Sequence, residues 1–171
     1  MALRPGRTTR RIKRPWTRVS MKKPKMSYVA GAPHSRIHVF EMGNKERKFD
    51  TNLWLIAKRP VQIRDNALEA ARVIANKFLE RQLGSDNYFM KVLVYPHQVL
   101  REHAIARGAG ADRYSMGMRK AFGKPKGRAS IVKANQKILW LKLDKKNVEI
   151  GKEALRRSDS KIPTPCSILI E

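Results

Sequence analysis

The most regular spacing of apolar residues along the chain lies between Asn66 and Leu83. Apolar side chains recur there every three or four residues, which predicts an amphipathic helix. The apolar stripe consists of Ala67, Ala71, Ile74, Ala75, Phe78 and Leu79. Asn66 and Glu69 have the spacing of a capping box, and Gly84 stands where a helix stop is expected. A second, shorter helix is predicted for Asn147 to Arg157.

Shorter apolar stretches between turn residues predict strands, and a turn at Gly43-Asn44 separates the first two. The strand-like stretches contain Ile37, Val39 and Phe40; Leu53, Leu55 and Ile56; Tyr88 to Tyr95; Ala129 to Val132; Ile138 to Leu143; and Ile168 to Ile170. Two helices among about six short strands, without regular alternation, predict an α+β fold in which the helices pack on mixed or antiparallel strands. Trp140 could lie on either face of its strand.

The stretch from Arg101 to Ser130 breaks this pattern, because it carries five of the ten glycines and many basic residues. Glycine lets a backbone approach a partner closely, and Lys and Arg supply charge and donors for phosphate. We therefore predict a mobile nucleic-acid-binding loop at residues 101–127; the alternative is a solvated, flexible insertion. The side chains expected to face RNA are Arg101, His103, Arg107, Arg113, Met116, Arg119, Lys120, Phe122, Lys124, Lys126 and Arg128.

Residues 1–30 predict an extended arm, because Pro, Arg and Thr occur there without apolar periodicity. The first carboxylate of the chain is Glu41, so everything before it is basic or neutral. We expect residues 31–171 to form a single α+β domain that follows this arm. The candidate RNA-binding residues of the arm and its junction with the domain are Arg4, Arg7, Arg10, Arg11, Lys13, Arg14, Trp16, Arg18, Lys22, Lys23, Lys25, His34 and Arg36.

The charge of the whole chain strengthens the nucleic-acid interpretation. Lys plus Arg number 38 and Asp plus Glu number 14, which gives a formal charge of +24 among 171 residues. Such an excess implies a permanent anionic partner, and a phosphate backbone suits it because each basic contact releases counterions. A membrane surface is the other anionic candidate, but prolines interrupt the basic arm where an amphipathic helix would be needed.

The sequence contains the beginnings of catalytic and metal-binding motifs, but each motif is incomplete. Gly117 to Lys124 resembles a phosphate-binding loop, yet its spacing is one residue too long and Pro125 replaces the hydroxyl residue. His34 and His38 lie on an extended segment, too far apart to share one ion. Cys166 is the single cysteine, which excludes an internal disulfide and fits a reducing compartment. We expect no enzyme activity, no metal and no cofactor.

Several motifs of this chain resemble those of a known family. The most specific is the loop itself, and the others are spread in order over nearly the full length. The matching runs are Arg4-Pro5, Pro15-Trp16-Thr17-Arg18, Gly31 to Ile37, Ala67 to Arg72, Ala111-Asp112-Arg113, Gly117-Met118-Arg119, Ala121 to Pro125, Glu153 to Arg157 and Lys161 to Thr164. The chain resembles the universal large-subunit ribosomal protein numbered sixteen in bacteria and ten-e in archaea and eukaryotes, and its length looks archaeal.

This resemblance implies an α/β hammerhead-type domain embedded in large-subunit ribosomal RNA. It also implies a cytoplasmic, ribosome-bound protein that lies beside the aminoacyl-tRNA and peptidyl-tRNA sites and contacts neighbouring ribosomal proteins. The glycine-rich loop would then reach towards the peptidyl transferase centre. The alternative from another class is a free chromatin-type or repressor protein, which would need a helix that offers base-reading side chains to a major groove. The Asn66–Leu83 helix looks instead like a core-packing element.

Overall fold

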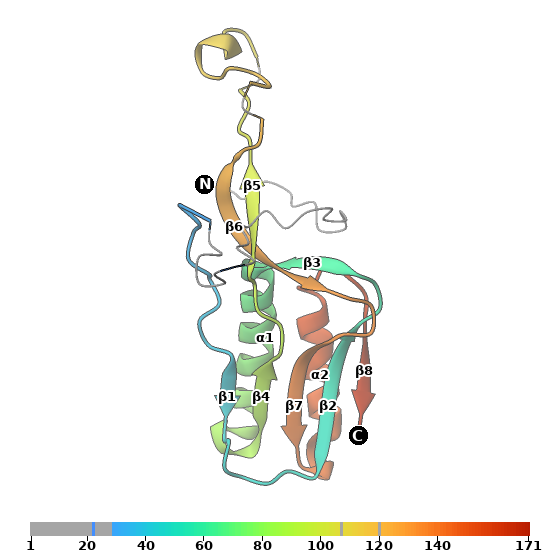
Figure 1. The fold of residues 1–171 in the computed structure, drawn as a ribbon. Coiled ribbons are helices and arrows are strands. Elements are labelled where there is room, and N and C mark those ends of the chain that lie inside the picture. Colours follow the sequence, from blue (N-terminus) through green and yellow to red (C-terminus); the bar gives the residue numbers. More distant parts are fainter. Residues whose placement is uncertain (1–21, 23–28, 107, 120) are drawn as a thin grey trace.

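The computed structural model describes residue 22 and residues 29–106, 108–119 and 121–171. The arm at residues 1–30 lies outside them, apart from Lys22, Val29 and Ala30. Figure 1 shows a body of two helices on a sheet, from which a long hairpin projects. The helices and strands are β1 (Glu41–Gly43), β2 (Thr51–Ala57), β3 (Val61–Arg64), α1 (Asp65–Leu83), β4 (Phe89–Val92), β5 (Gln98–Glu102), β6 (Lys124–Val132), β7 (Lys137–Leu143), α2 (Val148–Asp159) and β8 (Cys166–Ile170).

The strands form two antiparallel sheets. The larger has the order β1-β4-β7-β2-β8, and the smaller has the order β3-β6-β5. Both α-helices lie on the same face of the larger sheet, with its strands in front of them in Figure 1. This arrangement confirms the predicted α+β fold.

The core lies between this sheet and the two helices. Alternate residues of β2 and β7 point towards the helices and are fully buried, as the pleat of a strand requires. Gly151 of α2 packs directly on them, and a Cβ at this position would collide with the Leu143 side chain. The helices are tied together where the Ser158 hydroxyl donates to the carbonyl of Ala71 at 3.0 Å. The fully buried side chains include Leu53, Leu55, Leu68, Leu79, Tyr88, Met90, Leu139, Leu141 and Leu143.

The start of the described domain differs from the prediction. Ile37 to Phe40 form no strand, and β1 begins only at Glu41. Ile37 is nevertheless buried in the core, because the segment is held there by the Asp65 carboxylate, which accepts from the Arg36 amide at 3.0 Å. The Gly43-Asn44 turn does not join two neighbouring strands either, since β4 and β7 lie between β1 and β2.

The predicted capping box of α1 is also wrong. The helix begins one residue earlier, and its N-cap position is Arg64, whose side chain makes no capping bond. In the first turn the Asp65 carboxylate accepts a hydrogen bond instead, from the amide of Asn66 to Oδ1 at 2.9 Å. Asp65 is buried because the chain before β1 packs over it.

Candidate nucleic-acid interface

The hairpin of β5 and β6 carries the glycine-rich segment away from the body (Figure 1). Both ends of the predicted 101–127 loop belong to these strands, so the connecting residues are 103–123. The two strands pair antiparallel, with a register shift between Leu100 and Arg101. A paired stem of this kind holds the tip at a distance from the core, which is a suitable position for reaching a large partner.

Hydrogen bonds inside the tip give the connection a local structure. The ring Nε2 of His103 lies 2.6 Å from the carbonyl oxygen of Gly117 and closes the base of the tip. The Ser115 hydroxyl accepts from the amide of Ala106 at 3.3 Å, and the Ser115 amide donates to Ala111 at 3.0 Å. Ala111 is the first residue of a short 3-10 helix, Ala111–Arg113. His103 is therefore engaged within the protein.

The junction between tip and stem depends on Gly123. Its φ of +83° lies in the left-handed region, and a Cβ there would lie 2.8 Å from the carbonyl carbon of Glu102. The Arg101 guanidinium covers this junction, because it lies 4.3 Å from the centre of the Phe122 ring and donates to the Gly123 carbonyl at 3.2 Å. Two residues predicted to face RNA, Arg101 and Phe122, thus contact each other.

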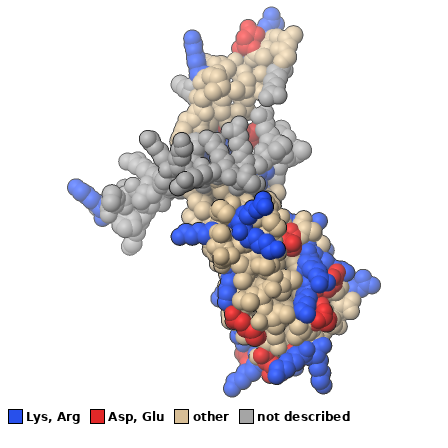
Figure 2. All heavy atoms as spheres, turned by 90° about the vertical axis from the view of Figure 1, so that its right-hand side faces the viewer, with Lys and Arg blue, Asp and Glu red and all other residues tan. Residues whose placement is uncertain are grey.

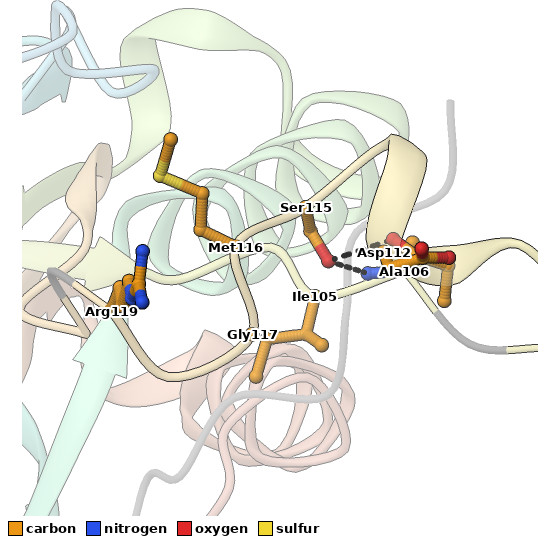
Figure 3. Close-up of a pocket in the computed structure, with 8 residues that line it drawn as sticks. Ile105, Ala106, Asp112, Ser115, Met116, Gly117 and Arg119 are labelled. Carbon is orange, nitrogen blue, oxygen red and sulfur yellow. Dashed lines mark hydrogen bonds between the residues drawn. The ribbon is translucent and has the colours of Figure 1, made fainter.

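An open hollow of about 580 Å³ lies within the tip (Figure 3). In this view the bonded Ser115 and Ala106 lie on one side, while Met116 and Arg119 lie apart from them. The hollow has both a carboxylate, from Asp112, and a guanidinium, from Arg119, at its wall. Its lining residues are Ile105, Ala106, Ala111, Asp112, Ser115, Met116, Gly117 and Arg119.

Large apolar side chains are exposed along the residues of the tip, and one of them, Met116, lines this hollow. Tyr114 is 85% exposed, Met116 73%, Met118 71% and Phe122 61%, and side chains of this size are rarely left in water together without a partner. Met116 and Phe122 were predicted from the sequence to face RNA, whereas Tyr114 and Met118 were not. The available signal was their presence in a segment otherwise made of small and charged residues.

The predicted RNA-facing residues fall into three groups. Some are exposed, whereas Arg101, His103 and Arg128 are half-buried, and Arg128 donates to the Pro33 carbonyl at 2.7 Å. Other predicted residues lie outside the described part of the chain, so the structure does not place them. The exposed group consists of Lys22, His34, Arg36, Arg113, Met116, Arg119, Phe122, Lys124 and Lys126. The residues outside the described part are Arg4, Arg7, Arg10, Arg11, Lys13, Arg14, Trp16, Arg18, Lys23, Lys25, Arg107 and Lys120.

Figure 2 shows how charge is distributed over one side of the molecule. Lys and Arg side chains stand out over the body, with fewer Asp and Glu side chains between them, and others stand at the end of the hairpin. Within the described residues, no group of three or more His, Cys, Asp or Glu side chains is placed to hold a metal ion. None of the described helices is long and apolar enough to cross a bilayer.

These features define a basic protein with a projecting hairpin tip. The ribosomal protein L16p/L10e family matches residues 16–169, which is most of the chain. The chain is 52% identical to the large ribosomal subunit protein uL16 of Archaeoglobus fulgidus over 171 residues, 100% of this chain and 94% of that relative. It is 46% identical to the protein of the same name from Thermofilum pendens over 172 residues, 100% of this chain and 98% of the relative.

A third relative, uL16 of Picrophilus torridus, is 43% identical over 171 residues, 99% of this chain and 93% of the relative. The chain therefore belongs to the ribosomal protein L16p/L10e family, in its archaeal form. This confirms the predicted family. As a member of a structural ribosomal protein family, the chain is not an enzyme.

Proposed function

We propose that the chain is a structural component of the large ribosomal subunit in the cytoplasm, where it binds large-subunit ribosomal RNA and contacts tRNA through the tip of the β5–β6 hairpin. The observation that carries this proposal is the tip itself, which holds exposed arginines beside exposed aromatic and Met side chains at the end of a paired stem. Arginine binds phosphates, and exposed aromatic side chains can stack on unpaired bases. Neighbouring ribosomal proteins are further partners.

Different parts of the chain have different roles in this proposal. The basic arm at residues 1–30 binds ribosomal RNA and supplies a large part of the salt-dependent affinity. The half-buried basic residues of the hairpin, Arg101 and Arg128, position the hairpin through their carbonyl contacts. The exposed Arg113 and Arg119 are left to contact tRNA phosphates.

The test replaces Arg113 and Arg119 with Ser in large subunits reconstituted with this protein. We expect normal incorporation, and a reduction of tRNA binding or of the rate of peptidyl transfer by about thirtyfold or more, since two charge-assisted contacts are lost and each is worth about 1 kcal/mol or more. The matched control is Arg59→Ser with Arg81→Ser, which removes the same charge from exposed positions of the body. Equal activity of the two double variants in both assays would exclude a tRNA-binding role of the tip.

A further inference from the structure

The face of the larger sheet opposite the helices carries a pair of stacked tryptophans. Leu53 and Leu141 point towards α2, so Trp54 and Trp140, one residue away on their strands, point to the opposite side. The two tryptophans are direct partners in the register of β2 and β7. Their rings are nearly parallel, 6° apart, with centres separated by 4.9 Å.

A lysine ammonium group lies over each tryptophan. The Nζ of Lys137 is 3.6 Å from the ring centre of Trp54, and the Nζ of Lys142 is 4.4 Å from that of Trp140. Because the inner faces of the two indoles are against each other, the ammonium groups occupy the outer faces. Phe89 meets Trp140 edge-on at 6.0 Å and also lies beside Lys142. We call Lys137, Trp54, Trp140 and Lys142 the lysine–tryptophan row.

Both indole N–H groups are held by hydrogen bonds. Trp140 Nε1 donates to Asn52 Oδ1 at 3.1 Å, and Trp54 Nε1 donates to Glu171 Oε2 at 3.2 Å. Stacking and hydrogen bonding together fix the rings, and the rings in turn restrict where the ammonium groups lie. Such side chains lose less conformational entropy on binding than freely moving surface lysines.

The charges of this face are only partly balanced. Glu41 is engaged by two lysines, Lys45 and Lys91, whose hydrogen bonds lower the pKa of its carboxyl to about 2. Glu171 lies 3.7 Å from Lys137, whereas Lys142 has no carboxylate partner among the described residues. Contact with an aromatic ring leaves the positive charge of a lysine in place. The row therefore presents fixed positive charge that can bind an anion.

We propose that the lysine–tryptophan row binds the sugar–phosphate backbone of large-subunit ribosomal RNA, at a surface separate from the hairpin and the arm. This inference rests on the proposed function. The ring faces are already covered, so bases cannot stack on them, and the contact is to phosphate and independent of base sequence. The excess charge of +24 over the whole chain favours a polyanion over an acidic protein segment as the partner.

The test measures binding of the full chain to purified large-subunit ribosomal RNA over a range of salt concentrations. Lys137→Gln with Lys142→Gln should lower the slope of log affinity against log salt by about 1.5, because each phosphate contact contributes somewhat less than one unit. The matched control is Lys77→Gln with Lys161→Gln, two exposed lysines on the helical side of the molecule, and its slope should change much less. Thermal melting of each variant verifies that it is folded.

Two other outcomes of this experiment would overturn the inference. A slope change no larger than that of the control excludes phosphate contacts at the row. If that slope is unchanged but the variant is washed out of assembled subunits at lower salt than the control, the partner is an acidic protein segment instead. Deletion of residues 1–30 serves as the reference for ribosomal RNA binding, and the Arg113→Ser, Arg119→Ser variant serves as the reference for tRNA binding. If neither change weakens binding of its own RNA, the proposed function fails as a whole, whereas a failure confined to the row removes only this inference.

The two tryptophans act as positioning residues for the lysines, and a separate measurement tests this role. Trp54→Leu with Trp140→Leu keeps both lysines, so the salt slope should stay near that of the unchanged protein, while affinity for the RNA falls about threefold to tenfold because the ammonium groups are no longer held. Trp54→Phe with Trp140→Phe should restore part of the affinity, since phenyl rings also attract cations. Equal affinities of the Leu and Phe variants would overturn the positioning role.

Discussion

Phe78 and Leu79 are neighbours on α1 that have different surroundings. Leu79 is fully buried, whereas Phe78 is half-buried and its ring is covered by the Arg157 guanidinium of α2 at 3.9 Å. The predicted apolar stripe placed both in the core. In the structure the buried face of α1 is rotated slightly from the predicted stripe, so that Leu68 is buried and Ala67 is only partly buried. Spacing alone cannot fix this rotation, because it is set by the contact of the helix with α2 and the sheet.

This difference predicts the cost of truncating each side chain. Leu79→Ala should lower the free energy of unfolding by about 3–5 kcal/mol, because it leaves a cavity in the core. Phe78→Ala should cost about 1–3 kcal/mol, because the ring is already partly in contact with water and the guanidinium that covers it is exposed. Chemical denaturation of the two variants measures both values. A larger loss for Phe78→Ala than for Leu79→Ala would contradict the structural argument.

At the scale of single elements, the hairpin depends on Gly123 at its junction with the tip. Gly123→Ala should destabilise the junction by about 1–3 kcal/mol, because it forces a left-handed conformation on Ala and brings its Cβ against the backbone of Glu102. Gly127 provides the control, since it has no left-handed φ and a Cβ there meets nothing within 4 Å. Hydrogen exchange at the amides of β5 and β6 should accelerate in Gly123→Ala only. Equal exchange in both variants would show that the junction tolerates a side chain.

The elements with a clear apolar pattern could be predicted from the sequence, whereas β3, β5 and the first half of β6 could not. α1, α2, β2 and β7 carry enough apolar positions to show their period. β3 and β5 were missed because each is short and has a buried glutamine in its interior or at its start, Gln62 and Gln98. A polar residue in a strand obscures the alternation on which the prediction rests, and only the pairing with β6 explains why these residues are buried.

The candidate site was named from its composition, which carries no information on its shape. Glycine and basic residues singled out the segment that forms the hairpin tip. They could not show that Arg101, His103 and Arg128 bond to backbone carbonyls of the protein, because these partners lie 14 to 95 residues away along the chain. The lysine–tryptophan row was not predicted either, since it requires the register of β2 and β7.

At the scale of the whole molecule, the distribution of charge predicts how the affinity for RNA is divided between residues 1–30 and the domain that follows. Deletion of residues 1–30 should leave a domain that still melts cooperatively, because the buried core of the described part of the chain is built from residues between Ile37 and Ile162. It should bind large-subunit ribosomal RNA more weakly and with a shallower salt dependence, by a little under one unit for each lost phosphate contact. Calorimetry and salt-dependent binding test the two statements separately. Loss of cooperative melting contradicts the first, and an unchanged slope contradicts the second.

The hairpin leaves the larger sheet after β4 and the chain returns to it as β7, and these two strands are adjacent partners in that sheet. The segment that contains β5, the tip and β6 is therefore an insertion between two neighbouring strands, and it leaves and rejoins the larger sheet at the same place. Residues could be added to or removed from the tip without changing the spacing of the strands below. The length of the tip therefore sets how far the hairpin reaches, and it can be altered by mutation without rebuilding the core of the body.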